Sequence, residues 1–162
     1  MTAKKTLVAY FSASGETARL ARTLADVTGG DLHEIVPAEP YTAADLDWND
    51  RTSHSSLEMN DPASRPAVAS RVAGMDAYDV VFVGFPIWWY VAPTIVSTFL
   101  EAYDFAGKTV VPFATSGGSG MGRTEDVFKA CCAPETRWLP GRRMSSRASE
   151  AEVRRWVEGL GL

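Results

Sequence analysis

The sequence predicts a three-layer, doubly wound α/β fold, in which helices cover both faces of a parallel sheet. Short β-rich segments alternate with segments of helical periodicity along the 162 residues, a pattern that favours parallel strands joined by crossover helices. The strongest β segment, residues 79–85 (DVVFVGF), is uninterrupted by charge from Val80 onward, which is typical of a strand buried on both faces. We therefore expect one domain, residues 1–162, with a five-stranded parallel sheet.

The first half of the chain contains two strands and one helix. Residues 5–11 (KTLVAYF) are typical of a buried strand. Apolar residues within 17–27 recur at three- and four-residue steps, which predicts a helix that ends at Gly29 and Gly30. Residues 32–36 alternate between apolar and polar, so we expect the second strand at an edge of the sheet.

A long segment, residues 37–75, separates the second strand from the third. It exceeds the length of an ordinary crossover, so we expect a helix inside a long excursion that has a role in function. Tyr41, Trp48 and Met59 in this segment are candidates for covering one face of a planar ligand.

The second half of the chain completes the alternation. A helix opens at Pro93, a residue favoured in the first turn, and its apolar positions Ile95, Val96, Phe99 and Leu100 face inward. The remaining elements are a fourth strand at 108–114, in which Pro112 implies a bulge, a helix at 123–132, a short fifth strand at 136–139 and a terminal helix at 149–160.

Composition and charge exclude several classes of protein. The chain is 46% hydrophobic and 22% charged, which is typical of a globular protein. Its net charge of −4 and pI of about 5.2 lack the basic character of a nucleic-acid binder. No segment is long and apolar enough for a signal-peptide core or a membrane span, so we expect a cytoplasmic protein. Adjacent Cys131 and Cys132 rule out a disulfide framework, and with only two histidines no metal site is expected.

Charge is distributed unevenly along the chain. Residues 26–61 contain nine acidic residues and a single base, Arg51, whereas residues 137–155 contain six arginines and two glutamates. The acidic segment is either a solvated face or a docking face beside a ligand.

Three loops are the candidates for ligand binding, because open α/β sheets bind ligands beyond the carboxyl ends of their strands, where the strand order reverses. With the order 2-1-3-4-5, the loops after strands one, three and four meet at that edge. Residues 12–17 (SASGET) combine hydroxyl groups with a helix N-terminus, which makes either a phosphate cradle or simple capping by Ser14. Residues 86–90 (PIWWY) offer flat surfaces to a planar ligand, and 115–122 (TSGGSGMG) let the backbone approach it closely.

Taken together, these segments resemble the flavodoxin family, and specifically its branch with Pro-Ile-Trp-Trp and Gly-Gly-Ser-Gly loops. The resemblance covers nearly the whole chain, through TLVAYFSASGETARLA, DVVFVGFPIWW and FLEAYDFAGKTVVPFATSGGSGMG. It implies a flavodoxin-like fold that binds FMN noncovalently. Two positions depart from the family pattern: Glu16 stands where a Ser-Gly-Asn-Thr motif has asparagine, and Tyr90 stands where relatives usually have glycine.

The resemblance also implies the residues that would bind FMN. Those around the phosphate are Ser12, Ser14, Gly15, Glu16, Thr17 and Ala18. Those flanking the isoalloxazine ring and the ribityl chain are Pro86, Ile87, Trp88, Trp89, Tyr90, Thr115, Ser116, Gly117, Gly118 and Ser119. No catalytic side chain is required, because the flavin itself supplies the redox chemistry.

Two functions fit this interpretation. The first is a small electron carrier whose redox partner proteins dock near the flavin edge; an acidic neighbourhood would lower the flavin potential, which suits an electron donor. The second is an enzyme that oxidises NAD(P)H and reduces a quinone or a similar small acceptor. A cofactor-free binding module is a third alternative. A phosphoacceptor receiver domain, a nucleoside triphosphatase and a serine hydrolase are disfavoured, because the sequence lacks their motifs.

Overall fold

The computed structural model describes residues 5–12, 15–39, 64–87, 92–115 and 124–162. The sheet is parallel, in the order β2-β1-β3-β4-β5, which confirms the predicted fold class and strand order. A sixth strand, β6, was not predicted and also pairs with β4. The strands are β1 (Thr6–Tyr10), β2 (Asp31–Glu34), β3 (Val80–Pro86), β4 (Thr109–Thr115), β5 (Arg137–Trp138) and β6 (Arg142–Arg143).

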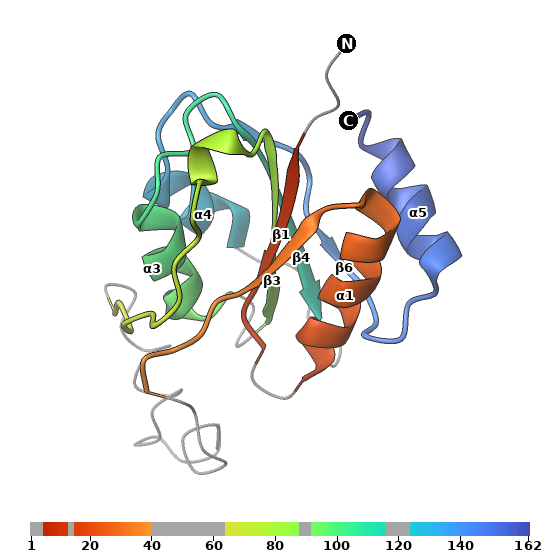
Figure 1. The fold of residues 1–162 in the computed structure, drawn as a ribbon, viewed down its shortest axis with the longest axis horizontal. Helices are drawn as coiled ribbons and strands as arrows, with labels where there is room; N and C mark the ends of the chain where they lie inside the picture. Colours follow the sequence, from red (N-terminus) through yellow and green to blue (C-terminus); the bar gives the residue numbers. More distant parts are fainter. Residues whose placement is uncertain (1–4, 13–14, 40–63, 88–91, 116–123) are drawn as a thin grey trace.

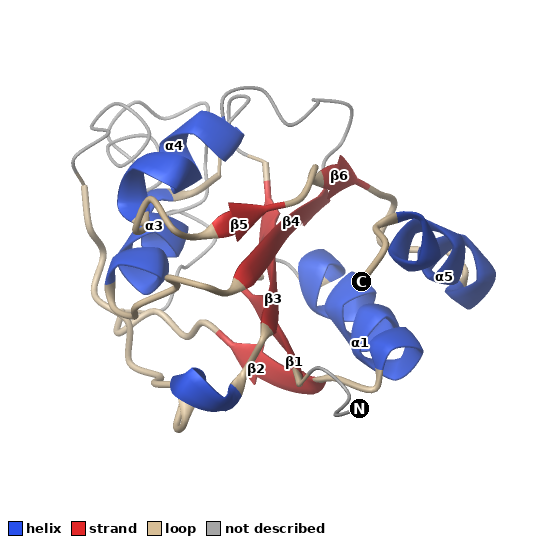
Figure 2. Cartoon of the chain, turned by 90° about the horizontal axis from the view of Figure 1, so that it is seen from above, coloured by secondary structure: helices blue, strands red, loops and turns tan. Residues whose placement is uncertain are grey.

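Helices cover both faces of this sheet, with α1 and α5 on one face and α3 and α4 on the other (Figures 1 and 2). The helices predicted at 17–27, 93–100, 123–132 and 149–160 are present with small shifts of their ends, and Pro93 is the residue immediately before α3. The helices are α1 (Glu16–Thr28), α3 (Thr94–Glu101), α4 (Thr124–Cys131) and α5 (Glu150–Gly159), and a short 3₁₀ helix, η1 (Met75–Ala77), precedes β3. No helix in the described ranges is long and apolar enough to cross a membrane.

Alternation of side chains along the strands divides the core into two apolar layers. Val8, Phe82 and Phe113 belong to the layer under α1 and α5, where the ring of Trp156 meets Phe82 edge-on with centroids 5.8 Å apart. The intervening strand residues belong to the layer under α3 and α4. Because β3 is buried along residues 80–85 and paired on both sides, it forms the centre of the sheet, as its apolar sequence predicts.

Pro112 does not interrupt β4, but it coincides with a gap in the strand pairing on the side of β4 that faces away from β3. β5 pairs with residues 109–110 and β6 with residues 113–114, so Pro112 falls between them. The Ala114 carbonyl accepts a hydrogen bond from the Met144 N–H at 2.8 Å, which shows that even-numbered residues of β4 present their backbone groups to this outer side. Proline has no N–H to donate there. The expected bulge in β4 is therefore absent, since β4 stays in continuous register with β3.

Within the described residues β2 pairs only with β1, so it is an edge strand, as predicted. Beyond β2, hydrogen bonds join the beginning and the end of the long excursion. The Ala38 N–H donates to the Ala67 carbonyl at 2.9 Å. The Ser70 hydroxyl donates to the Glu34 carbonyl, also at 2.9 Å. The helix predicted within residues 37–75 stays a prediction, because residues 40–63 lie outside the described residues.

The two cysteines are partly buried at the end of α4, packed against the apolar layer under α3 and α4. Burial raises the pKa of the Cys131 thiol and raises that of Cys132 to about 12. Since the thiolate is the reactive form of cysteine, neither residue is activated for redox or nucleophilic chemistry at neutral pH. Their role is packing, as expected for small, weakly polar side chains.

We predict that Gly84→Ala destabilises the protein by about 1–3 kcal/mol, because the added methyl group would overpack the core. A Cβ at Gly84 would lie 2.2 Å from Cζ of the Phe113 ring, so that the ring or the strand must move. The measurement is urea unfolding. Gly159→Ala is the matched control, since no atom lies within 4 Å of its Cβ position, and its free energy of unfolding should not fall. Equal stability of the two variants would contradict the prediction.

We also predict that His33 makes the protein less stable as the pH falls below about 6.5, the ordinary histidine value. Burial lowers the pKa of His33, only partly offset by the Glu34 carboxylate, and its Nε2 is buried without a hydrogen-bond partner. The neutral ring is therefore favoured in the folded state, so stability is present above the unfolded pKa and lost as the pH falls through the lower folded pKa. Thermal unfolding between pH 8 and pH 5 should show a smaller decline in His33→Gln than in the wild type, and His54→Gln serves as control.

Candidate functional site

The carboxyl ends of β1, β3 and β4 meet at the lower edge of the sheet in Figure 1. Backbone hydrogen bonds tie the chain together where the three loops begin. The Phe11 N–H donates to the Gly84 carbonyl at 2.9 Å, and the Ile87 N–H donates to the Thr115 carbonyl, also at 2.9 Å. The loops after β1, β3 and β4 therefore start from fixed and adjacent positions, as the strand order predicts.

A buried pair of hydroxyl groups links the first of these loops to the third. Thr17 Oγ1 and Thr115 Oγ1 lie 2.8 Å apart, one on α1 and the other at the end of β4. Both residues are buried, at 1% and 3% exposed. Each hydroxyl is thus satisfied mainly by the other, which fixes the start of α1 against the end of β4.

The Ser12 hydroxyl caps the N-terminus of α1, while Ser14, the cap suggested by the sequence, lies outside the described residues. Ser12 Oγ accepts hydrogen bonds from the N–H groups of Gly15 and Ala18, both at 3.1 Å. Gly15 adopts the left-handed conformation, with φ of 89°, at the residue before the helix. Among the described residues the N–H groups of Glu16 and Thr17 have no acceptor, as expected for the first turn of a helix.

This helix N-terminus fits an anion. Two backbone N–H groups are free in the described structure, and the position that a Cβ on Gly15 would occupy has no atom within 4 Å. Free first-turn donors and the helix dipole together favour a phosphate group at such a position. The Glu16 carboxylate is exposed on the same turn, where it stabilises the helix terminus but repels an anion.

Several other predicted site residues are described. Pro86 ends β3, and Ile87 is partly buried against the layer under α3 and α4, so this loop begins from the core. The remaining predicted residues lie outside the described ranges and stay predictions: Ser14, Trp88, Trp89, Tyr90, Ser116, Gly117, Gly118 and Ser119, with Tyr41, Trp48 and Met59 as candidate covers.

Two further hydroxyl groups lie where α3 and α4 begin, after the second and third loops. The Oγ1 atoms of Thr94 and Thr124 are buried and have no hydrogen-bond partner among the described residues, and Thr124 is 0% exposed. Their sequence context does not distinguish these two threonines, because a threonine at the start of a helix is ordinarily a local cap. In this fold the helices that follow parallel strands begin at the ligand edge of the sheet. This rule would have identified both threonines as candidate site residues.

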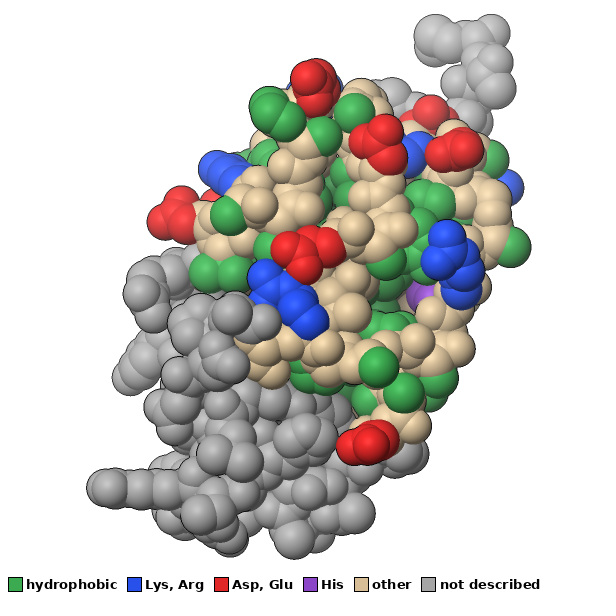
Figure 3. Space-filling view, turned by 90° about the vertical axis from the view of Figure 1, so that its left-hand side faces the viewer, with side chains coloured by type: hydrophobic (Ala, Val, Ile, Leu, Met, Phe, Trp, Pro, Cys, Tyr) green, Lys and Arg blue, Asp and Glu red, His purple; other side chains and the backbone are tan. Residues whose placement is uncertain are grey.

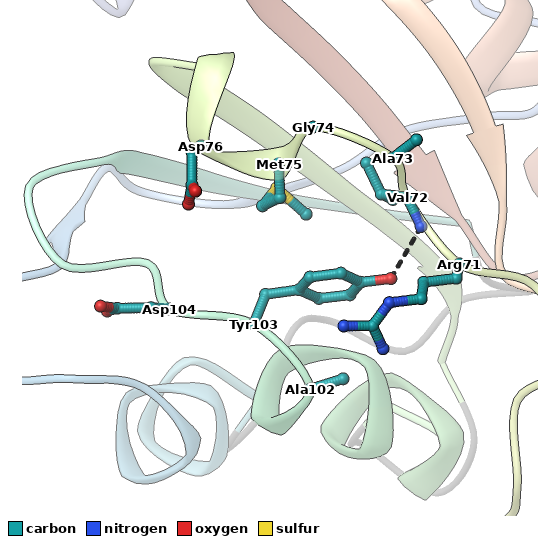
Figure 4. Close-up of a pocket in the computed structure, with 9 residues that line it drawn as sticks. All are labelled: Arg71, Val72, Ala73, Gly74, Met75, Asp76, Ala102, Tyr103 and Asp104. Atoms are coloured by element: carbon teal, nitrogen blue, oxygen red, sulfur yellow. Dashed lines mark hydrogen bonds between the residues drawn. The ribbon is translucent and has the colours of Figure 1, made fainter.

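One cleft of the described structure lies away from this edge. A cleft of about 570 Å³ lies between the segment before β3 and the end of α3, at the amino ends of the strands (Figure 4). There the Val72 N–H donates to the Tyr103 hydroxyl at 2.8 Å, and the Arg71 guanidinium lies 5.5 Å from the ring centroid. Asp76 and Asp104 lie at the other end of the cleft. These contacts hold residues 71–72, near the end of the excursion, against Tyr103, which follows α3.

The fold and the three convergent loop starts define a flavodoxin-like α/β protein. The family model described as flavodoxin matches residues 5–160. The chain therefore belongs to the flavodoxin family, as the resemblance of its loops to that family predicts. Among curated proteins, none matched the chain.

Solved structures agree with this assignment. A candidate flavoprotein from Bacteroides eggerthii is 51% identical, with 99% of each chain covered and a TM-score of 0.92. Another from Bacteroides uniformis is 49% identical over 97% of this chain and 99% of that one, with a TM-score of 0.90. A flavoprotein from Lactobacillus acidophilus, crystallised in complex with FMN, shares the fold at 24% identity, with 96% and 99% covered and a TM-score of 0.70.

We predict that the Thr17–Thr115 pair behaves as a unit in stability measurements. Thr17→Val leaves the buried Thr115 hydroxyl without its partner and should cost about 1–3 kcal/mol. The double variant Thr17→Val/Thr115→Val removes both hydroxyl groups and should cost less than the sum of the two single changes. Urea unfolding of all four proteins measures the coupling. Additive single and double changes would show that the 2.8 Å contact contributes no coupling.

Proposed function

We propose that this protein binds FMN noncovalently at the carboxyl edge of its sheet and carries electrons between redox enzymes. The observation that carries the proposal is the start of α1, where the N–H groups of Glu16 and Thr17 have no acceptor among the described residues and Gly15 adopts the left-handed conformation. A phosphate monoester is the group that such a terminus suits. Membership in the flavodoxin family and the FMN complex of the Lactobacillus acidophilus relative support the same cofactor.

In this proposal the chain binds and orients the cofactor. The N–H groups of Glu16 and Thr17 bind the phosphate. The Ser12 hydroxyl stabilises the turn by accepting hydrogen bonds from the N–H groups of Gly15 and Ala18. The loops that begin at Pro86 and Thr115 flank the ring system. Bound flavin supplies one- and two-electron chemistry, so the protein needs no catalytic acid or base. We place this activity in the cytoplasm.

The test is the visible absorption of the purified protein during FMN titration and then during stepwise anaerobic reduction. Tight binding with an accumulated one-electron-reduced flavin supports the carrier. Tight binding with direct passage to the two-electron state, together with steady NAD(P)H consumption in the presence of a quinone, supports the reductase instead. Absence of flavin binding overturns both and leaves the cofactor-free binding module.

We predict that Glu16→Gln strengthens FMN binding by about two- to tenfold at low salt, because it removes a carboxylate beside the phosphate. Asp26→Asn is the matched control, since it removes the same charge from an exposed position near the other end of α1. The dissociation constant of each variant is measured by fluorescence titration. Equal gains in both variants would attribute the effect to net charge rather than to the position of Glu16.

A further inference from the structure

The two edges of the sheet carry opposite charge. On the β2 side, Asp31 and Glu34 are exposed acidic residues. On the opposite side, all six arginines of residues 137–155 are exposed. Within the described part of the chain, the one ion pair among these arginines joins Arg154 to Glu150 at 3.0 Å. By contrast, the face that carries α3 and α4 intersperses both signs of charge (Figure 3).

The basic edge adjoins the candidate site. Arg143 pairs with Ala114, the residue before Thr115, and neighbouring strands lie about 4.8 Å apart. Arg142 is the other residue of β6, and successive strand residues point to opposite faces, so the two arginines flank the sheet on both sides. Arg147 follows in the turn between β6 and α5. Three cationic side chains, those of Arg142, Arg143 and Arg147, therefore belong to the segment that lies beside the carboxyl end of β4, on the side away from β3.

A cleft of about 450 Å³ extends this basic surface along α5. Its lining combines two arginines with apolar side chains: Arg142, Arg155, Leu139, Trp156 and Leu160. The nearby Glu125 carboxylate is already engaged, because its Oε1 accepts a hydrogen bond from the Gly141 N–H at 2.7 Å. Arginines around an apolar cleft are typical of a surface that contacts another protein.

We propose that β6 and the turn after it form a docking surface for an acidic redox partner protein, with Arg142, Arg143 and Arg147 as its charged anchors. The position beside the candidate site brings such a partner close to the proposed cofactor. The inference rests on the proposed function for electron transfer, whereas docking itself depends only on the arginines. Complementary charge would raise the association rate at low salt and lose that effect as salt is added.

The test uses an acidic blue-copper protein as the probe and the FMN-loaded chain. Isothermal titration with oxidised probe measures docking without electron transfer, at about 20 mM and about 200 mM ionic strength. The double variant Arg142→Glu/Arg143→Glu should weaken binding about tenfold at the lower salt. Arg137→Glu with Lys129→Glu is the matched control, because both residues are exposed and lie outside β6, the turn and α5. Stopped-flow transfer of one electron from the reduced protein to the copper should slow in parallel.

Three results would overturn the docking surface. Equal weakening by the control pair would show that net charge alone attracts the probe. Light scattering that detects salt-sensitive self-association, lost in Arg142→Glu/Arg143→Glu, would assign the surface to the acidic edge of a second copy. Loss of FMN binding in this variant would assign the arginines to the cofactor. Failure of the wild type to bind FMN overturns the proposed function, while calorimetry with the unloaded protein still tests docking.

Discussion

The parallel register of β1, β3 and β4 determines where the candidate site can form. β3 is buried and hydrogen-bonded on both sides, so backbone pairing with β1 and β4 and side-chain packing in both apolar layers hold the three strands in one register. The contact between Gly84 and the Phe113 ring adds a steric lock to this register. Because the three strands end together, Thr17 and Thr115 come within hydrogen-bond distance although 98 residues separate them in the chain.

The alternation of strands and helices was predictable from local sequence, because hydrophobic periodicity and glycine or proline boundaries are local signals. The division of the strand beside β4 into β5 and β6 was not predictable from local sequence. It depends on which side of β4 the nitrogen of Pro112 faces, and only the fold determines that side. The same limit applies at the site. The sequence suggests Ser14 as a cap, and only the fold shows that the Ser12 hydroxyl accepts hydrogen bonds from the N–H groups of Gly15 and Ala18. Most of the residues predicted to flank the flavin ring, from Trp88 to Tyr90 and from Ser116 to Ser119, lie outside the described ranges.

The fold shows which charged segments lie near the candidate site, and these differ from what the sequence alone suggests. From the sequence, the acidic residues of 26–61 are either a solvated face or a docking face beside a ligand. Glu34 of that segment does lie at the carboxyl end of β2, but Arg142 and Arg143 lie on the other side of the same edge, closer to the end of β4. Nearby cations stabilise an anionic reduced flavin, whereas nearby carboxylates destabilise it. The potential of a flavin bound here would therefore depend on which side of the edge its ring approaches.

The site also explains how a chain can depart from its family's motif and keep the same kind of terminus. An anion at the start of α1 would be held by backbone N–H groups and by the helix dipole, and neither depends on the side chain at position 16. The turn itself depends on Gly15, whose positive φ excludes most other residues, and on the Ser12 hydroxyl. A carboxylate at Glu16 therefore changes the electrostatic cost of binding without changing the geometry, while a side chain at position 15 would change both.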